Sequence, residues 1–267
     1  MTATPIGAIF SASLLVAGSA YSTPIHDVRH LDYALTSEAI VIDPILNQEW
    51  NDAATNLYLD ASGFNGVAMN LDIPEVVPGD DLQQAVNVGV QDLVNAVETQ
   101  YNAGAIDATD PLYIFGYSQS AVDASLAEQQ LADDGIPSAD LHFVLVGDSA
   151  SADGGFLNTF VDSLPESWQP FVAKAFGDLA GATTPDDLYP TDVYTLSADG
   201  WANWDDGANI LGLFTTHLEY LGLTAADVNS ATLSVVDGLT DYFTINSTDV
   251  NSWSALWEAL MIAVSVF

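Results

Sequence analysis

Apolar and polar positions along the chain follow two different periods, and each period predicts a kind of element. Residues 39–42 form a short continuous apolar run, and apolar residues alternate with small or polar ones from 67 to 73. Both patterns are typical of strands. Between 82 and 101 apolar residues recur every three or four positions, which places them on one face of an amphipathic helix. Asp80 and Asp81 precede this helix, where its dipole favours negative charge.

The same alternation continues along the chain. Residues 112–115, 141–146 and 193–196 are apolar runs that predict buried strands, and the pattern at 121–131 predicts a helix. Strand and helix thus alternate from 39 to about 147. This order favours an α/β fold with a central, mostly parallel sheet flanked by helices. We expect 193–196 to be the last core strand.

The chain contains no repeat or low-complexity linker, so residues 21–267 are expected to form one domain. Residues 156–190 are less regular and are expected to form a cap or insertion. Residues 253–267 predict an apolar helix that packs on the sheet or, alternatively, covers an acyl site. Residues 1–20 contain an apolar core with small residues before Tyr21, as in a signal peptide, which predicts a secreted or cell-envelope protein. An ordinary buried segment is the alternative.

Charge and composition restrict the possible partners. The chain has 267 residues, of which 37 are Asp or Glu, two are Lys or Arg and none is Cys, giving a net charge of −35. Binding to nucleic acid needs basic side chains against the phosphates, so this composition argues against it. A solvated acidic surface predicts a soluble monomer. The absence of Cys excludes disulfides, a thiolate nucleophile and a Cys-based zinc site.

The most informative segment is the sequence Gly-Tyr-Ser-Gln-Ser at residues 116–120, between a predicted strand and a predicted helix. This is the setting of a nucleophile elbow, in which a serine sits on a strained strand-to-helix turn. Small residues must lie two positions to either side, and Gly116 and Ser120 meet that need. The turn would present the Ser118 hydroxyl, and the amide of Gln119 would face a developing oxyanion. An ordinary helix-capping serine is the alternative.

A serine nucleophile needs a base, and in this arrangement the histidine follows the serine along the chain. Only His142 and His217 do so. His142 lies inside the predicted strand 141–146 and is expected to be structural, because a side chain in mid-strand cannot easily reach the carboxyl edge of the sheet. His217 follows the predicted strands and is the favoured base.

The acid should follow a strand and precede His217. Asp199 fits best, because the strand at 193–196 ends just before it. Its role would be to fix the imidazole tautomer and to stabilise the imidazolium. The competing acids are Asp205, Asp206 and, less well placed, Asp192.

The second oxyanion donor normally comes from the loop after an early strand, here Asp43-Pro44-Ile45. Pro44 has no amide hydrogen, so an amide near Ile45 is the candidate, and a carboxylate at Asp43 would oppose the oxyanion. His26 and His30 are spaced for a metal only on a helix and lack a third ligand. No metal or cofactor is therefore predicted.

Several segments carry a resemblance to a known family. They are Ala-Ala-Thr-Asn-Leu-Tyr at 53–58, Gly-Tyr-Ser-Gln-Ser-Ala at 116–121, Phe-Val-Leu-Val-Gly at 143–147 followed by Gly154-Gly155, Asp-Gly-Trp-Ala-Asn-Trp at 199–204, and His217. In these segments, which cover roughly residues 38–230, the chain resembles the PE-PPE domain family of mycobacteria and relatives. Members of that family are α/β serine hydrolases allied to cutinases.

The resemblance implies a cutinase-like α/β-hydrolase fold with Ser118 as nucleophile, Asp199 as acid and His217 as base. It also implies esterase activity on acyl esters or lipids, or acyl transfer between cell-envelope glycolipids. The chain departs from the family where Asp43-Pro44 replaces a Gly-rich stretch and where Leu218 replaces the glycine that often follows the histidine. A non-catalytic surface protein that keeps the hydrolase fold is the remaining alternative.

Overall fold

The computed structural model describes residues 39–43, 47–73, 82–163 and 176–264. Its strands form one seven-stranded sheet in the order β2-β1-β3-β4-β5-β7-β6. All neighbouring strands are parallel except β6 and β7, which form an antiparallel hairpin at one edge. The predicted segments 1–20 and 21–38, with His26 and His30, lie outside the described residues, so the signal peptide stays a prediction.

The strands are short and mostly buried. They are β1 (Ala39–Ile42), β2 (Ala68–Leu71), β3 (Leu112–Tyr117), β4 (Leu141–Val146), β5 (Thr191–Leu196), β6 (Thr232–Asp237) and β7 (Thr240–Ile245). The helices are α2 (Gln48–Ala54), α3 (Leu82–Asn102), α4 (Gln119–Asp133), α5 (Phe156–Ser163), α7 (Ala225–Asn229) and α8 (Ser252–Val264). These bounds confirm the predicted strands at 39–42, 67–73, 112–115, 141–146 and 193–196 and the predicted helices at 82–101 and 121–131.

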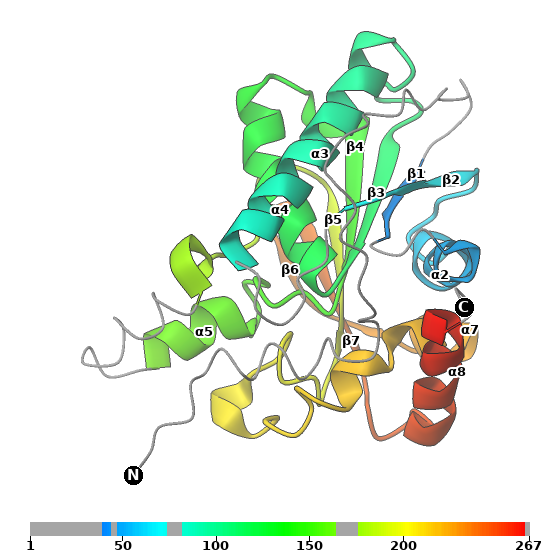
Figure 1. Cartoon of the computed structure of the whole chain (residues 1–267), viewed down its shortest axis with the longest axis vertical. Coiled ribbons are helices and arrows are strands. Elements are labelled where there is room, and N and C mark those ends of the chain that lie inside the picture. Colours follow the sequence, from blue (N-terminus) through cyan, green and yellow to red (C-terminus); the bar gives the residue numbers. More distant parts are fainter. Residues whose placement is uncertain (1–38, 44–46, 74–81, 164–175, 265–267) are drawn as a thin grey trace.

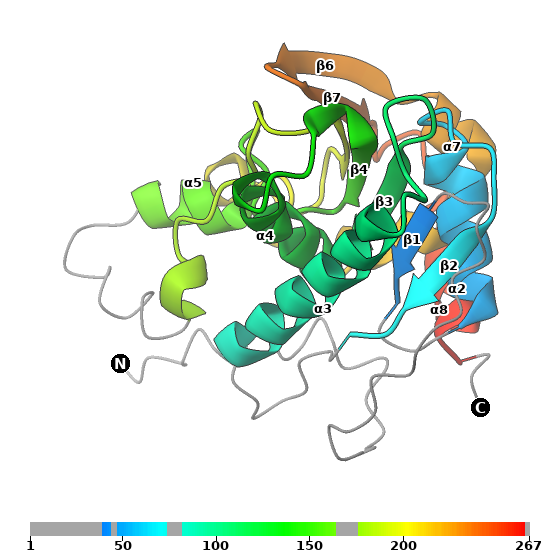
Figure 2. The same cartoon turned by 90° about the horizontal axis from the view of Figure 1, so that it is seen from above.

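Helices cover both faces of the sheet (Figure 1, Figure 2). On one face α3 and α4 pack against residues such as Ile40 and Ile114. On the other face Val41 and Phe115 pack against the segments that follow α2 and β5. Successive residues of β1 and β3 thus enter opposite cores, which is why these strands are continuously apolar.

The expectation that 193–196 is the last core strand is wrong. β7 pairs in parallel with β5 along Thr191–Leu196 and continues the sheet. β6 lies outside β7, and every residue of β6 is exposed, so no apolar alternation distinguished it. The Asp237-Gly238 pair at the turn, with φ of +56° at Gly238, is nevertheless a common hairpin signal.

The predicted terminal helix is present as α8, while residues 265–267 lie outside the described chain. Its buried Ala255 and Ile262 belong to the same apolar cluster as Val41 and Val146 of the sheet, and its main contacts are with the turn Tyr220–Gly222, followed by α2 and the turn Thr216–Leu218. Gly222 permits this contact, because a side chain there would overlap the backbone of Ala255. No helix within the described ranges is both long and apolar enough to cross a membrane.

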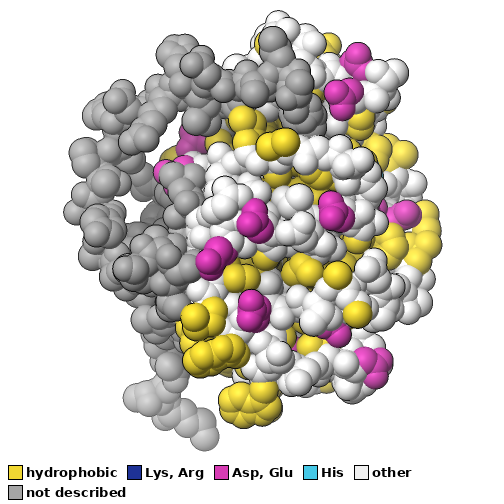
Figure 3. Space-filling model, turned by 90° about the vertical axis from the view of Figure 1, so that its right-hand side faces the viewer, with side chains coloured by type: hydrophobic (Ala, Val, Ile, Leu, Met, Phe, Trp, Pro, Cys, Tyr) yellow, Lys and Arg dark blue, Asp and Glu magenta, His cyan; other side chains and the backbone are white. Residues whose placement is uncertain are grey.

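The described chain carries no Lys or Arg, because Arg29 and Lys174 both lie outside it. Figure 3 shows the face with α2 and α8, where acidic side chains are scattered among neutral and hydrophobic ones. Stability in this part of the molecule therefore rests on the apolar cores, not on Lys or Arg ion pairs. The predicted cap at 156–190 is described only in part, as α5 and residues 176–190, and stays a prediction.

Candidate active site

Ser118 occupies a strained turn between β3 and α4. Its φ and ψ are 60° and −118°, a backbone conformation that residues with a side chain rarely adopt. A side chain at Gly116 would overlap the carbonyl of Ser120, so glycine is required there. The Ser120 hydroxyl accepts from the Tyr117 amide and donates to the Tyr117 carbonyl, both at 2.9 Å. Gly116 and Ser120 thus make the turn possible.

The turn places the Ser118 hydroxyl against His217. Ser118 Oγ lies 2.8 Å from His217 Nε2, and His217 Nδ1 lies 2.9 Å from Asp199 Oδ2. Asp199 follows β5 and is fully buried, and His217 lies in the turn Thr216–Leu218 and is 4% exposed. The structure therefore brings together the three residues that the sequence singled out, at the carboxyl edge of the sheet.

The chemistry of each partner decides which atom donates in the hydrogen bonds around Asp199. Its Oδ1 accepts from the backbone amide of Trp201 at 2.8 Å, so the carboxylate acts there as an acceptor. Its Oδ2 lies 2.9 Å from Nδ1 of His217, and because an ionised carboxylate has no hydrogen to donate, Nδ1 is assigned as the donor. Nε2 then carries the lone pair that faces the Ser118 hydroxyl. This is the protonation state in which a histidine acts as a general base.

Two tyrosine hydroxyls hold the segment that carries His217. Tyr117 donates to the carbonyl of His217, and Tyr58 donates to the carbonyl of Tyr220 at 2.8 Å. Sequence reasoning missed both contacts, because neither tyrosine lies in a periodic pattern that points to His217. It also missed Tyr220, whose hydroxyl donates to Asp199 Oδ2 at 2.8 Å.

The other candidates are placed elsewhere. His142 lies in β4, with its Nε2 atom 3.2 Å from Oδ2 of Asp192, and it stacks on Tyr113 with ring centroids 4.7 Å apart. These contacts give His142 and Asp192 a structural role, as expected for His142. Asp205 is exposed in the turn that follows Trp204, and the side chain of Asp206 lies outside the described part of the structure.

Of the two predicted oxyanion donors, Gln119 lies within the described residues and Ile45 does not. Gln119 is the first residue of α4, so its amide lies at the positive end of the helix dipole, next to Ser118. Ile45 falls outside the described residues and stays a prediction. The Asp43 carboxylate is buried and accepts from the Asn47 amide at 2.5 Å and from Asn70 Nδ2 at 3.0 Å, so it stabilises the turn into α2.

Three buried acids, Asp123, Glu128 and Asp148, take no part in the hydrogen bonds that join Ser118, His217 and Asp199. Burial raises the pKa of Asp148, directly after β4, to about 6, against hydrogen bonds from Thr184 and Ala150 that lower it. Burial likewise raises the pKa of Asp123 and Glu128, both on α4, well above their usual range. Within the described chain, no cluster of three or more His, Asp or Glu side chains could hold a metal ion.

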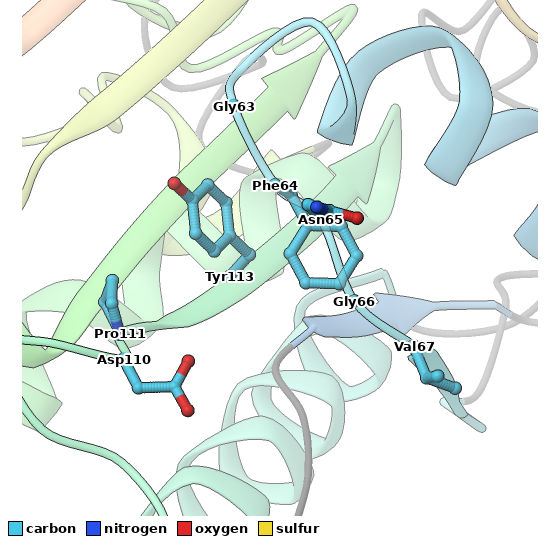
Figure 4. A pocket seen from close by; sticks show the side chains of 8 residues that line it. All are labelled: Gly63, Phe64, Asn65, Gly66, Val67, Asp110, Pro111 and Tyr113. Carbon is cyan, nitrogen blue, oxygen red and sulfur yellow. The ribbon is translucent and has the colours of Figure 1, made fainter.

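A cavity of about 630 Å³ opens at the opposite edge of the sheet (Figure 4). It is lined by Gly63, Phe64, Asn65, Gly66, Val67, Asp110, Pro111 and Tyr113. Tyr113 belongs to the amino-terminal half of β3, whereas Ser118 follows its carboxyl end. No residue of the candidate site lines this cavity.

The architecture is that of an α/β-hydrolase: a mostly parallel sheet with a serine on the turn after a central strand. The family model of the PE-PPE domain matches residues 69–250. The chain belongs to the PE-PPE domain family. The resemblance recognised in the sequence is thereby confirmed.

Similar proteins include two from Mycobacterium tuberculosis (strain ATCC 25618 / H37Rv). An uncharacterized PPE family protein, PPE28, is 29% identical over 76% of this chain and 32% of its own length. Esterase PE16 is 31% identical over 58% of this chain and 29% of its own length. The PE-PPE chain thus spans about a third of these relatives.

Two solved structures are also similar to the PE-PPE chain. A cutinase-like protein from Cryptococcus sp. is 17% identical, with a TM-score of 0.36 over 69% of this chain and 95% of that one. The esterase of Pyrobaculum calidifontis is 18% identical, with a TM-score of 0.43 over 86% of this chain and 75% of that one.

Proposed function

We propose that this PE-PPE domain is a serine esterase that hydrolyses acyl esters through Ser118, His217 and Asp199. The observation that carries the proposal is the continuous set of hydrogen bonds from the Ser118 hydroxyl through the His217 ring to the buried Asp199 carboxylate. One relative, Esterase PE16, is named for the same class of reaction. The proposed reaction uses only residues of this chain, the ester and water.

The first half of the reaction forms an acyl-enzyme. Ser118 Oγ attacks the ester carbonyl carbon while its proton passes to Nε2 of His217, and Asp199 stabilises the resulting imidazolium. The carbonyl oxygen becomes an oxyanion, which the amide of Gln119 at the start of α4 is placed to stabilise. The carbon–oxygen bond to the alcohol then breaks, and His217 returns the proton to the departing alcohol.

The second half repeats these steps with water. His217 takes a proton from the attacking water, the bond to Ser118 Oγ breaks, and the serine regains its proton. The products are the carboxylic acid and the free enzyme. If a sugar hydroxyl replaces the water, the same residues transfer the acyl group, which is the acyltransferase alternative.

Exposed apolar side chains favour an ester with a hydrophobic acyl chain. The segment between Asp199 and His217 carries Ile210, Leu211 and Phe214, which are 52%, 78% and 41% exposed. Large side chains that stay exposed next to a site offer apolar contact to a substrate. The net charge of −35 disfavours anionic substrates.

The proposal is tested by ester hydrolysis and covalent labelling of the whole chain. Wild type, Ser118→Ala and a control, Ser138→Ala, are compared on short and long p-nitrophenyl esters and with a fluorophosphonate probe. Ser138 lies before β4 at the opposite edge of the sheet, where its hydroxyl binds the Leu188 carbonyl. We expect labelling and turnover in wild type and Ser138→Ala, and neither in Ser118→Ala.

The other outcomes separate the alternatives. Labelling of Ser118 without turnover contradicts the esterase and favours a transferase without its acceptor. No labelling of wild type contradicts the catalytic role of Ser118 and leaves a protein that keeps the fold without the chemistry. Secretion and a monomeric state are separate predictions, which these experiments do not test.

A further inference from the structure

One oxygen of Asp199 receives two hydrogen bonds. Oδ2 accepts from Nδ1 of His217 at 2.9 Å and from the Tyr220 hydroxyl at 2.8 Å. The Tyr220 hydroxyl in turn accepts from the backbone amide of Leu196 at 2.8 Å. Tyr220 is fully buried, so its hydroxyl is shielded from bulk solvent.

The direction of each bond in this chain follows from its first donor. A backbone amide can only donate, so the amide of Leu196 occupies a lone pair of the Tyr220 oxygen and the hydroxyl proton is free for Asp199. Burial, and then the charge of Asp199, raise the pKa of Tyr220 well above its usual value. The hydroxyl therefore remains a neutral donor across the pH range in which an esterase works.

We propose that Tyr220 is a positioning residue for the reaction at Ser118: its hydroxyl holds the Asp199 carboxylate in the orientation that fixes the His217 ring. The proposal rests on the proposed function of Ser118, His217 and Asp199. The Tyr220 ring also lies edge-on to the His217 ring, with centroids 6.1 Å apart. Replacement of Tyr220 by Phe keeps this ring contact, so that variant isolates the effect of the hydroxyl on Asp199. The hydrogen-bonded relay that leads to Ser118 therefore starts at the amide of Leu196, at the end of β5. It continues through Tyr220, Asp199 and His217.

The surroundings hold Tyr220 in one place. Its carbonyl accepts from the Tyr58 hydroxyl at 2.8 Å, and its ring lies 5.6 Å from that of Tyr117. A Cβ atom at Gly147 would lie 3.0 Å from the Tyr220 ring, so the end of β4 packs directly against it. A side chain fixed by three elements is suited to fixing a second one.

The titratable groups that face this relay come from several elements. Asp199 faces His217 and Tyr220, and its charge also reaches Glu219, whose pKa burial raises and a hydrogen bond from Ser252 lowers. Tyr58 faces Tyr220, and the Tyr117 hydroxyl binds the carbonyl of His217. Of these groups, the Tyr220 hydroxyl and the His217 ring are the two that form hydrogen bonds with Asp199 Oδ2 in the described part of the chain.

The variant Tyr220→Phe keeps the ring and removes the donor. We expect kcat to fall about 10-fold to 100-fold, the range for a lost hydrogen bond to a charged group, with KM nearly unchanged because Tyr220 does not touch the substrate. Without the hydrogen bond from Tyr220, the negative charge of Asp199 stabilises the His217 imidazolium more strongly. The acid limb of the pH–rate profile should therefore move to higher pH.

Tyr189→Phe is the matched control. Tyr189 is equally buried, and its hydroxyl donates to the Ile136 carbonyl at 3.0 Å in the core on the other face of the sheet. The Tyr189→Phe variant therefore loses a buried tyrosine hydrogen bond that has no connection to Asp199. Equal effects of the two variants on kcat and on the acid limb would show a loss of stability alone and would overturn the proposal.

A double-mutant cycle with Asp199→Asn tests the route of the effect. If Tyr220 acts through Asp199, adding Tyr220→Phe to Asp199→Asn lowers the rate much less than adding it to wild type. Additive losses would contradict a role through Asp199. Circular dichroism identifies any variant that fails to fold.

Nitrogen NMR of the His217 ring provides a readout that does not need turnover. In wild type the proposal predicts a protonated Nδ1 and an unprotonated Nε2 at neutral pH, assigned with His217→Gln. The opposite tautomer overturns it. If wild type neither labels nor turns over, the proposed function fails, yet this spectrum and the shift of the His217 titration midpoint in Tyr220→Phe still decide whether Tyr220 orients the ring.

Discussion

Gly147 lies against the ring of His217: a Cβ atom built at Gly147 would be 3.2 Å from Cε1 of the imidazole. Gly147 directly follows β4 and has a φ of +61°, so both its backbone and its missing side chain make room for the base. The backbone just after β4 thus forms part of the wall that keeps His217 in reach of Ser118.

Gly147→Ala should therefore impair both stability and turnover. An alanine at this positive φ costs about 1–2 kcal/mol, and the added methyl group moves the His217 ring. We expect a lower melting temperature and a fall in kcat larger than the loss of folded protein explains. Gly135→Ala is the control, since Gly135 also has a positive φ but no atom within reach of a Cβ. Equal kcat values for the two variants contradict this account.

The strain at Ser118 predicts a gain in stability when the side chain is removed entirely. Ser118→Gly and Ser118→Ala both lose the hydroxyl, but only glycine adopts φ 60° and ψ −118° without cost. We expect Ser118→Gly to be about 1–2 kcal/mol more stable than Ser118→Ala in denaturant unfolding. If the alanine variant is as stable as the glycine variant, the turn is not strained.

The buried acids predict that stability falls as pH rises. Burial, and then the charge of Asp148, raise the pKa of Glu128 well above its ordinary value, and burial raises that of Asp148 to about 6. Both groups bind a proton more tightly in the folded state, so their contribution is complete below the ordinary carboxyl pKa and is lost as pH rises through the folded value.

Glu128→Gln tests this dependence. The variant should gain stability relative to wild type between pH 5 and pH 8, by on the order of 1–3 kcal/mol, because glutamine needs no proton to stay neutral. Chemical unfolding at fixed high salt is the measurement, since salt screens the general repulsion of the acidic surface. Glu258→Gln, at an exposed position, should show no such gain. A pH-independent difference between Glu128→Gln and wild type refutes the assignment.

The exposed residues near the site predict a dependence on acyl chain length. Leu211→Ser should lower kcat/KM for long p-nitrophenyl esters about 3-fold to 10-fold and leave short esters unaffected, because contact with a few methylene groups is lost. Val67→Ser is the control, since Val67 is 72% exposed, close to the 78% of Leu211, but lies at the opposite edge of the sheet. An equal loss for short and long esters argues against an acyl contact at Leu211.

The parts of the fold that the sequence predicted are those with a local signal. Strands such as β3 and β4 are buried on both faces and therefore continuously apolar, and the elbow at Ser118 is defined by a few neighbouring residues. Asp199 could be placed because it follows a strand. β6 could not, because it is an exposed edge strand whose only signal is its turn.

The contacts of Tyr220 had no signal of this kind. The two partners of its hydroxyl, Leu196 and Asp199, lie 24 and 21 positions earlier in the chain. The turn Tyr220–Gly222 has no period from which a facing residue could be predicted. Only the folded arrangement of β5 and the His217 segment brings the hydroxyl to the carboxylate.

Peptide mapping after reaction with a fluorophosphonate tests the central claim most directly. The account predicts one phosphonyl adduct on Ser118 in wild type, and labelling slowed by at least about 100-fold in His217→Gln, since general-base assistance contributes on this scale. An adduct elsewhere, or equal labelling rates in wild type and His217→Gln, would contradict the claim that His217 activates Ser118.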